Sequence, residues 1–271
     1  MRGYLKATFV ICLIIAFASC GGGKRKASDY LKEAEVAYKS GNFALAKLKI
    51  DSAKLLFPKA FNEIDAGFKM MQQVRLEENR RNITFCDSML SVNYKVLNDM
   101  LTKFNYVRDD KYQEFGEYYP KVYTLGSNSS GIRSGVKERG ALFIESVLVG
   151  NPIKHNKIRV STKGGEEAET LVVTADGLNY TFKTINNSFE IVRYVGADEN
   201  NISQFIYTHN DQPMTVKFVG NRTVPLTLPK ASIEGISNSF ELSNLLLDIE
   251  QLKFEKERSE TLIRYLESKS K

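Results

Sequence analysis

The sequence predicts an α+β protein with helices in the N-terminal half and in the C-terminal tail, and antiparallel strands between them. Apolar residues recur at helical steps over residues 27–124, the period changes to two after Gly140, and helical steps return from Asn238. Because the strand blocks follow one another without room for crossover helices, their pairing should be antiparallel. We therefore expect an N-terminal helical hairpin and long helices, an antiparallel β sandwich or barrel in the C-terminal half, and a closing coiled-coil helix.

Residues 1–19 have the pattern of a signal peptide. Two basic residues precede the uncharged, largely apolar run Ala7–Ala18, which is too short to span a bilayer. The run ends in Phe17-Ala18-Ser19-Cys20, which resembles the lipobox of bacterial lipoproteins, with Phe17 where that family usually has leucine. The alternative is ordinary cleavage nearby, with Cys20 incidental.

The lipoprotein resemblance implies that Cys20 becomes the acylated N-terminus, carrying diacylglyceryl and palmitate-type chains that anchor the protein to a membrane. Residues 20–26 would then form a lipidated, flexible tether that ends in Lys24, Arg25 and Lys26. Surface-exported lipoproteins of some lineages carry acidic residues after the cysteine. The basic tether therefore favours the bacterial cell envelope, with the protein on the outer membrane facing the periplasm.

Composition excludes several classes of protein. The net charge of +6 over 271 residues is modest, and part of the surplus lies in the tether, so no basic face predicts binding to nucleic acid. Of the three cysteines, only Cys86 lies outside residues 1–20, which rules out a disulfide framework. Cys86 falls on an apolar helical face, which favours a small buried residue over a redox or intermolecular thiol.

Residues 27–58 predict two antiparallel helices separated by a turn at Gly41-Asn42. The pattern resembles one tetratricopeptide repeat, a family of helical hairpins. The matching residues are Tyr30, Ala34, Gly41, Asn42, Phe43, Ala46, Ile50, Ala53 and Pro58. No second copy follows, so the next helices must cover this hairpin, and a hairpin without a peptide-binding groove is the simpler interpretation.

Residues 59–105 continue as helix and complete a helical domain over 27–124. The polar stretch at 77–82 is either a turn or a solvent-exposed middle of the helix. The end of this domain is rich in aromatic residues, three of them at helical steps. Exposed rings here could stack on the sugars of a polysaccharide, whereas rings at helical spacing more often pack in a core. The candidate interaction residues are Tyr106, Tyr112, Phe115, Tyr118, Tyr119 and Tyr123.

A Gly/Ser-rich segment at 125–140 predicts a linker, followed by a β domain over 141–230. Alternating patterns and turn residues predict its strands. The expected strands are Ala141–Val149, Lys157–Thr162, Thr170–Thr174, Leu178–Thr184, Phe189–Tyr194, Ser203–His209, Met214–Val219 and Thr223–Leu228.

The tail over 238–268 predicts a helix with apolar residues at alternating steps of three and four, opened by Asn238 and Glu241 as a capping box. Its expected partner is the long helix of the N-terminal half, which needs a cover. The competing partner is a second copy of the chain.

Candidates for catalysis or metal binding are few. His155 is expected in a polar turn and His209 at a strand end, neither with companions at ligand spacing. Residues 198–201 could offer oxygens to calcium but lack the ligand spacing of a helix–loop–helix site. We predict no catalytic, cofactor-binding or metal-binding residues. Ser52 and Ser88 follow aspartate in a pattern resembling a periplasmic O-glycosylation sequence, which is short enough to occur by chance.

The sequence therefore predicts a non-enzymatic scaffold or adaptor that binds another envelope protein. A glycan-binding lipoprotein is the alternative, and an envelope hydrolase with a fold-assembled carboxylate pair is a weaker one. The oligomeric state is left open.

Overall fold

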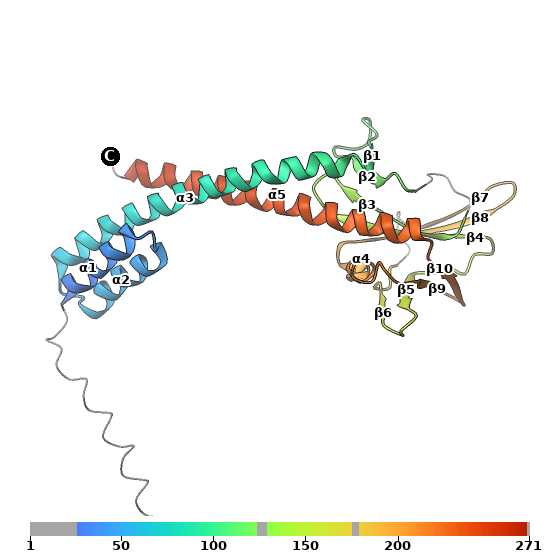
Figure 1. Ribbon diagram of the computed structural model, residues 1–271, viewed down its shortest axis with the longest axis horizontal. Helices are drawn as coiled ribbons and strands as arrows, with labels where there is room; N and C mark the ends of the chain where they lie inside the picture. Colours follow the sequence, from blue (N-terminus) through green and yellow to red (C-terminus); the bar gives the residue numbers. More distant parts are fainter. Residues whose placement is uncertain (1–25, 124–128, 175–178, 270–271) are drawn as a thin grey trace, which may run out of the picture. The chain divides into compact units, whose positions relative to one another are not determined.

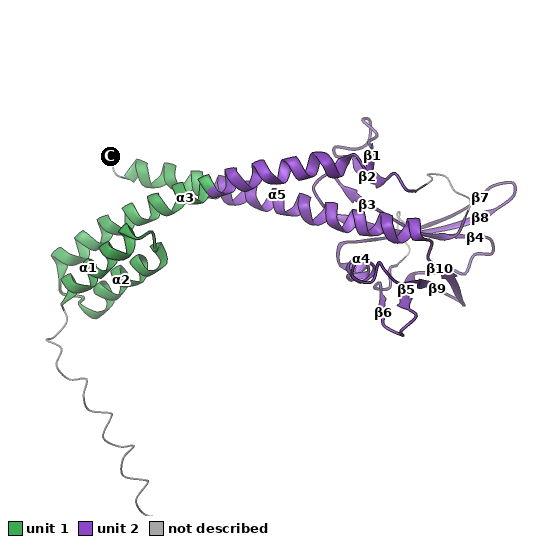
Figure 2. Ribbon diagram, in the orientation of Figure 1, with its two compact units in different colours: residues 1–84, 258–271 green, residues 85–257 purple. Residues whose placement is uncertain are grey.

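The computed structural model describes residues 26–123, 129–174 and 179–269. The predicted signal peptide, Cys20 and nearly all of the predicted tether lie outside the described residues. The chain forms two compact units, residues 1–84 with 258–271 and residues 85–257 (Figure 2). The boundary falls inside both long helices, α3 (Phe61–Leu101) and α5 (Lys230–Lys269).

Unit 1 contains the predicted helical hairpin, formed by α1 (Ala27–Lys39) and α2 (Phe43–Leu56) (Figure 1). Gly41 turns the chain with a φ of 74°, a conformation that favours glycine. Asn42 caps α2, since its side chain accepts a hydrogen bond from the Leu45 N–H at 3.1 Å. The hairpin therefore turns at the residues that the sequence indicates.

Small side chains let the helices of unit 1 pack closely. Ala34, Ala37 and Ala46 are buried together with Ile50 and with Val74 of α3. The last part of α5 also belongs to this unit, where Asn82 Nδ2 donates to Ser259 Oγ at 2.8 Å. In unit 1 the C-terminal helix thus contacts the long N-terminal helix, as predicted.

Unit 2 holds two antiparallel sheets and no closed barrel among its described residues, so the α+β class and the antiparallel pairing are confirmed. One sheet has the order β1-β2-β3-β4-β8-β7, and the other has the order β10-β9-β5-β6. The strands are β1 (Phe104–Val107), β2 (Glu117–Pro120), β3 (Gly131–Lys137), β4 (Leu142–Val149), β5 (Lys157–Thr162), β6 (Glu167–Glu169), β7 (Tyr180–Lys183), β8 (Ser188–Val195), β9 (Met214–Val219) and β10 (Thr223–Thr227).

The two sheets share one core with α4 (Ile202–Thr208) and the first turns of α5. Ile144 of β4, Phe218 of β9 and Ile236 of α5 are fully buried in it. Further along α5, Leu242 and Leu246 pack with Phe104 and with the end of α3. In unit 2 as well, therefore, α5 contacts α3.

The aromatic segment that the sequence assigns to a helix is a β-hairpin instead. Helix α3 ends at Leu101, and β1 pairs with β2 from Phe104↔Pro120 to Val107↔Glu117. Aromatic residues suit a half-buried sheet as well as a helix, so the spacing of Tyr112, Phe115 and Tyr119 by three and four residues was misleading. The predicted helical domain over 27–124 thus changes to strands before it ends.

The predicted linker over 125–140 is also wrong in part, because Gly131–Lys137 is strand β3. It lies inside the six-stranded sheet, paired with β2 and β4. Ile132 and Val136 are buried on one of its faces, which explains why a Gly- and Ser-containing segment forms a strand.

Three further predictions about the β region fail. Thr170–Thr174 is not a strand, and the short β6 precedes it. Ser203–His209 was predicted as a strand, but these residues lie almost entirely in α4, which buries Ile202 and Ile206 four residues apart. Finally, α5 begins at Lys230 rather than near Asn238, so its first two turns join the core of unit 2.

None of the helices among the described residues is both long and apolar enough to cross a membrane.

Candidate functional site

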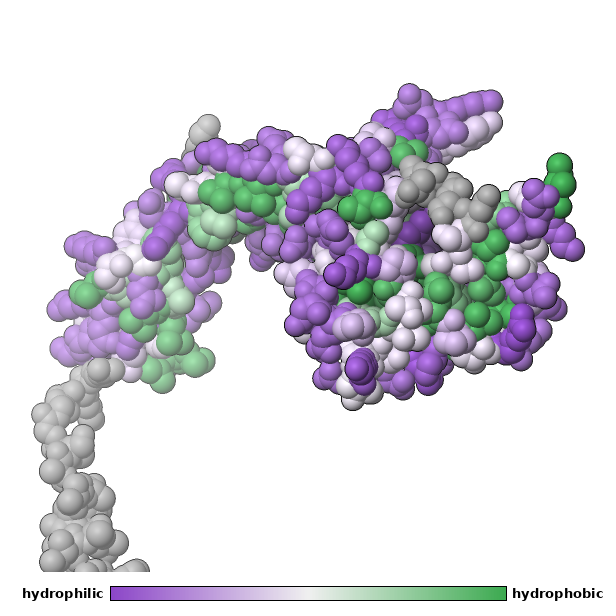
Figure 3. Space-filling model, turned by 45° about the vertical axis from the view of Figure 1, so that its right-hand side comes forward, coloured by the Kyte–Doolittle hydropathy of each residue, from purple (hydrophilic) through white to green (hydrophobic). Residues whose placement is uncertain are grey.

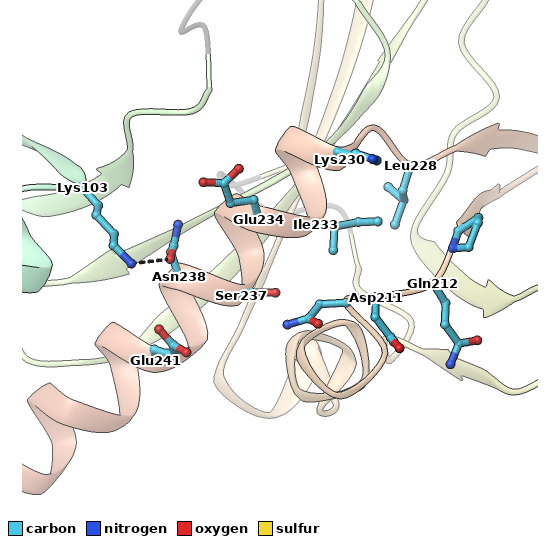
Figure 4. A pocket seen from close by; sticks show the side chains of 12 residues that line it. Lys103, Asp211, Gln212, Leu228, Lys230, Ile233, Glu234, Ser237, Asn238 and Glu241 are labelled. Atoms are coloured by element: carbon cyan, nitrogen blue, oxygen red, sulfur yellow. Dashed lines mark hydrogen bonds between the residues drawn. The ribbon is translucent and has the colours of Figure 1, made fainter.

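The largest described cavity of unit 2 surrounds the first three turns of α5, with a volume of about 880 Å³ (Figure 4). We call it the α5 pocket. Its walls come from four places in the chain: the end of α3, the turn after α4, the end of β10 and α5 itself. Its lining residues are Lys103, Asn210, Asp211, Gln212, Pro213, Leu228, Lys230, Ile233, Glu234, Ser237, Asn238 and Glu241.

The floor of the α5 pocket is apolar and buried. Leu228 and Ile233 are 4% and 7% exposed, and both belong to the core cluster of the two sheets. Because this floor is continuous with the core, it is held rigidly, and a ligand would meet a preformed surface.

One polar atom on this floor has no hydrogen-bond partner among the residues that the structure describes. Ser237 is 9% exposed, and its Oγ is buried without a partner. In Figure 4 this hydroxyl points from α5 towards the side on which Asp211 lies. A buried hydroxyl left unpaired costs about 1–3 kcal/mol, so this position favours a ligand that supplies the missing hydrogen bond.

The rim of the α5 pocket is charged. Lys103 Nζ donates to Asn238 Oδ1 at 3.3 Å. Glu234 and Glu241 project from the same side of α5 as Asn238 (Figure 4). Within the described part of the chain, the carboxylates of Asp211, Glu234 and Glu241 and the ammonium group of Lys230 form no ion pair. Their charges are therefore free to meet a ligand, with an excess of carboxylates over ammonium groups.

A second polar cluster lies buried between the sheets, where the sequence had placed His155 in a polar turn. The His155 side chain is fully buried, with Nδ1 at 2.6 Å from Glu190 Oε1 and Nε2 at 2.7 Å from Ser146 Oγ. Burial lowers the pKa of His155 from its ordinary 6.5, although the Glu190 carboxylate opposes this effect. We call these three residues the His155 cluster.

Glu190 also holds the chain that leads into β5. One carboxylate oxygen accepts from the backbone N–H groups of Ile153 and Lys154 at 2.9 and 3.0 Å, and the other accepts from the His155 N–H. With the His155 ring, the carboxylate thus has four donors. Lys154 has a φ of 54°, and this left-handed turn aims the three N–H groups at Glu190.

The order of contacts in the His155 cluster is that of a serine–histidine–carboxylate triad. Its three residues are buried, however, as in a hydrogen-bond network that stabilises the fold. Ser146 has no exposed surface, and its hydroxyl lies 3.3 Å from the Val192 carbonyl oxygen in the neighbouring strand. A nucleophile must reach the carbon that it attacks, and Ser146 does not line the cavity of about 530 Å³ that borders His155 and Glu190. The cluster therefore binds β4, β8 and the segment before β5 together.

The remaining polar candidates have local roles. His209 ends α4, with Nδ1 at 2.8 Å from the Phe205 carbonyl oxygen and Nε2 at 3.3 Å from Glu166. Glu199 accepts from the backbone N–H groups of Asn201 and Ser203 and so caps α4. In the three described segments no group of histidine, cysteine and acidic residues could hold a metal ion.

Among the candidate aromatic residues, the rings of Tyr106 and Tyr118 lie 5.1 Å apart between centroids, and the other four rings contact different partners. Tyr118 packs with the core beside α5, whereas Tyr119 lies edge-on to Phe143 at 5.7 Å between ring centroids. The Tyr123 hydroxyl lies 3.2 Å from Ser134 Oγ, and burial raises the pKa of Tyr123. These three rings are structural.

The other three aromatic candidates lie in or beside the β1–β2 hairpin. Tyr106 is 47% exposed, and its hydroxyl donates to Glu138 at 2.8 Å, which raises the pKa of this tyrosine. Tyr112 is 74% exposed with Lys111 near its ring, and Phe115 is covered on one face by Arg139 at 4.0 Å. The six rings thus form no common platform on which sugars could stack.

Cys86 is 1% exposed, and burial raises the pKa of its thiol. Its predicted burial is confirmed. Ser52 is half-buried in α2 and donates to the Leu48 carbonyl oxygen at 2.7 Å, whereas Ser88 is exposed on α3. Glycosylation of either serine stays a prediction.

Comparisons with known proteins found no matching family model, no matching curated protein and no matching solved structure.

Proposed function

We propose that this chain is a non-enzymatic adaptor of the bacterial cell envelope, anchored to a membrane through Cys20, and that the α5 pocket binds an extended segment of a partner protein. The anchor is supported by the pattern of residues 1–20. The observation on which the binding role rests is the α5 pocket, with its rigid apolar floor, its unpaired Ser237 hydroxyl and its free charges.

A peptide segment fits these features better than an apolar small molecule. Its backbone N–H and C=O groups can pair with the Ser237 hydroxyl and the rim amides, and an apolar side chain can cover Leu228 and Ile233. A basic side chain of the segment would meet the carboxylates of Asp211, Glu234 and Glu241. An apolar floor with a polar rim is the usual anatomy of a protein interface.

The test is cross-linking in the native envelope. A photoreactive amino acid replaces Asn238, which lines the α5 pocket. The matched control replaces Asn244, an exposed asparagine of α5 that does not line it. We expect a discrete protein adduct from position 238 only, identified by mass spectrometry and lost in the mislocalised variant Cys20→Ser.

Equal adducts from both positions, or none from position 238, would contradict the assignment of the α5 pocket as the binding site. An adduct with polysaccharide in place of protein would replace the adaptor by a glycan-binding role.

A further inference from the structure

Unit 1 exposes large apolar side chains at the end of the hairpin where α1 begins and α2 ends. Leu55, Leu56 and Phe61 are 80%, 55% and 75% exposed, and Lys54 and Lys59 beside them are exposed as well. We call these five residues the apolar tip. Figure 3 shows other hydrophobic side chains at the surface, but such scattered exposure is common.

The apolar tip lies next to the first turn of α1. The rings of Tyr30 in α1 and Phe57 after α2 are 5.9 Å apart between centroids, which places the α2–α3 turn beside the start of the described chain. Lys26 is exposed at that start, and Lys24 and Arg25 precede it in the sequence. The region also contains carboxylates: Asp29 accepts from the backbone N–H of Lys26 at 2.9 Å, and Asp51 and Glu63 line the same hollow as Lys54.

The length of the preceding chain limits how far this end can lie from Cys20. Six residues lead from Cys20 to Lys26, and a fully extended chain of that length reaches about 20 Å. An acyl chain on Cys20 would therefore hold Lys26 within that distance of the lipid headgroups, and the apolar tip lies at the same end of the hairpin as Lys26.

We propose that the apolar tip docks on the membrane surface, with Leu55, Leu56 and Phe61 inserted at the headgroup boundary and Lys54 and Lys59 on anionic headgroups. Leucine and phenylalanine flanked by lysine are the residues with which peripheral elements bind such interfaces. The docking orients unit 1 on the bilayer, which the acyl anchor alone would not do. This inference rests on the anchor included in the proposed function.

The first test uses the acylated full chain in vesicles of phosphatidylglycerol and phosphatidylethanolamine. An environment-sensitive fluorophore is attached at Phe61→Cys, with Val36→Cys as the control, since Val36 is 70% exposed but lies in the third turn of α1. The native thiol of Cys86 is buried and should not be labelled. We expect brominated lipids to quench the probe at position 61 severalfold more than the probe at position 36.

The second test needs no acyl chain. A chain starting at residue 20 with Cys20→Ser is mixed with anionic vesicles, and binding is compared for Phe61→Glu and Phe85→Glu, two exposed phenylalanines of α3. We expect Phe61→Glu to weaken binding about tenfold and Phe85→Glu to leave it unchanged. Circular dichroism confirms that both variants fold.

Equal quenching at positions 61 and 36, or equal binding of the two glutamate variants, would overturn the docking proposal. A probe at position 61 that responds to a protein partner instead of to brominated lipid would also overturn it. Neither result changes the outcome expected for the cross-link at position 238, because that cross-link tests the α5 pocket and not the apolar tip. Failure of the docking is therefore distinguishable from failure of the adaptor role.

Discussion

Unit 2 contains two polar sites that differ in how completely their atoms are hydrogen-bonded. In the His155 cluster, Glu190 has four donors and both ring nitrogens of His155 have partners within 2.7 Å. In the α5 pocket, the Ser237 hydroxyl has no hydrogen-bond partner and several charged groups form no ion pair within the described segments. Groups that satisfy one another stabilise a fold, whereas unsatisfied groups beside a cavity are available to a ligand.

The largest effect should come from opening the His155 cluster. Glu190→Gln removes the charge and turns an amide N–H₂ towards N–H donors, so we expect the free energy of unfolding to fall by about 3 kcal/mol or more. Chemical denaturation measures the change. Glu234→Gln, at the exposed rim of the α5 pocket, is the control. An equal loss of unfolding free energy in both variants would show that the His155 cluster does not stabilise the fold.

The second effect is a pH dependence of stability. Because burial lowers the pKa of His155 below 6.5 in the folded chain, the unfolded chain binds a proton at pH values where the folded chain does not. Stability should therefore fall as the pH drops below about 6.5. Unfolding midpoints at pH 7.5 and 5.5 measure this loss.

We expect His155→Gln to reduce the difference between the two midpoints, while His209→Gln keeps it. An unchanged difference in His155→Gln would show that another group causes the pH dependence.

The third effect compares two serines on α5. Ser237→Ala removes an unpaired hydroxyl and should raise the free energy of unfolding by about 1 kcal/mol while weakening partner capture. Ser239→Ala removes the hydroxyl that accepts from Ser134 Oγ at 2.8 Å between the two oxygens, and it should lower the free energy of unfolding by about 1 kcal/mol. If both variants lose stability, the Ser237 hydroxyl has a partner within the protein.

The smallest effect on stability should come from the rim. Asp211→Asn and Glu234→Gln remove charges that form no ion pair within the described segments. The free energy of unfolding should therefore change by less than about 0.5 kcal/mol. The yield of the cross-link from position 238 should nevertheless fall. Full cross-linking in the double variant would show that the partner does not use these carboxylates.

Sequence patterns predicted the elements whose periodicity is regular. Lys157–Thr162 and Met214–Val219 alternate strictly, and both are strands with the predicted bounds. The helical hairpin was also predictable, because Gly41-Asn42 interrupts two helical patterns. Residues 104–120 were misassigned because three aromatic residues fall at helical steps of three and four, while aromatic residues as a type are also common in strands.

The polar sites were harder to predict because each is assembled from distant segments. Lys103, Asp211 and Ser237 meet only through the packing of α5 on the sheets, so no local pattern marks the α5 pocket. The His155 cluster did leave one signal, a carboxylate at Glu190 within the apolar run Phe189–Val192. A charge in a buried strand requires a partner, but the sequence does not say which residue provides it.

The place of α5 after all the strands of unit 2 has a consequence for the order of folding. Ser134 of β3 bonds to Ser239, 105 residues later, and the Gly140 carbonyl oxygen accepts from Ser243, 103 residues later. During synthesis, one face of β3 and β4 therefore stays uncovered until α5 has been made, about a hundred residues later. The core of unit 2 thus closes only after the last of its described strands, and until then its apolar residues are exposed to solvent or to other chains.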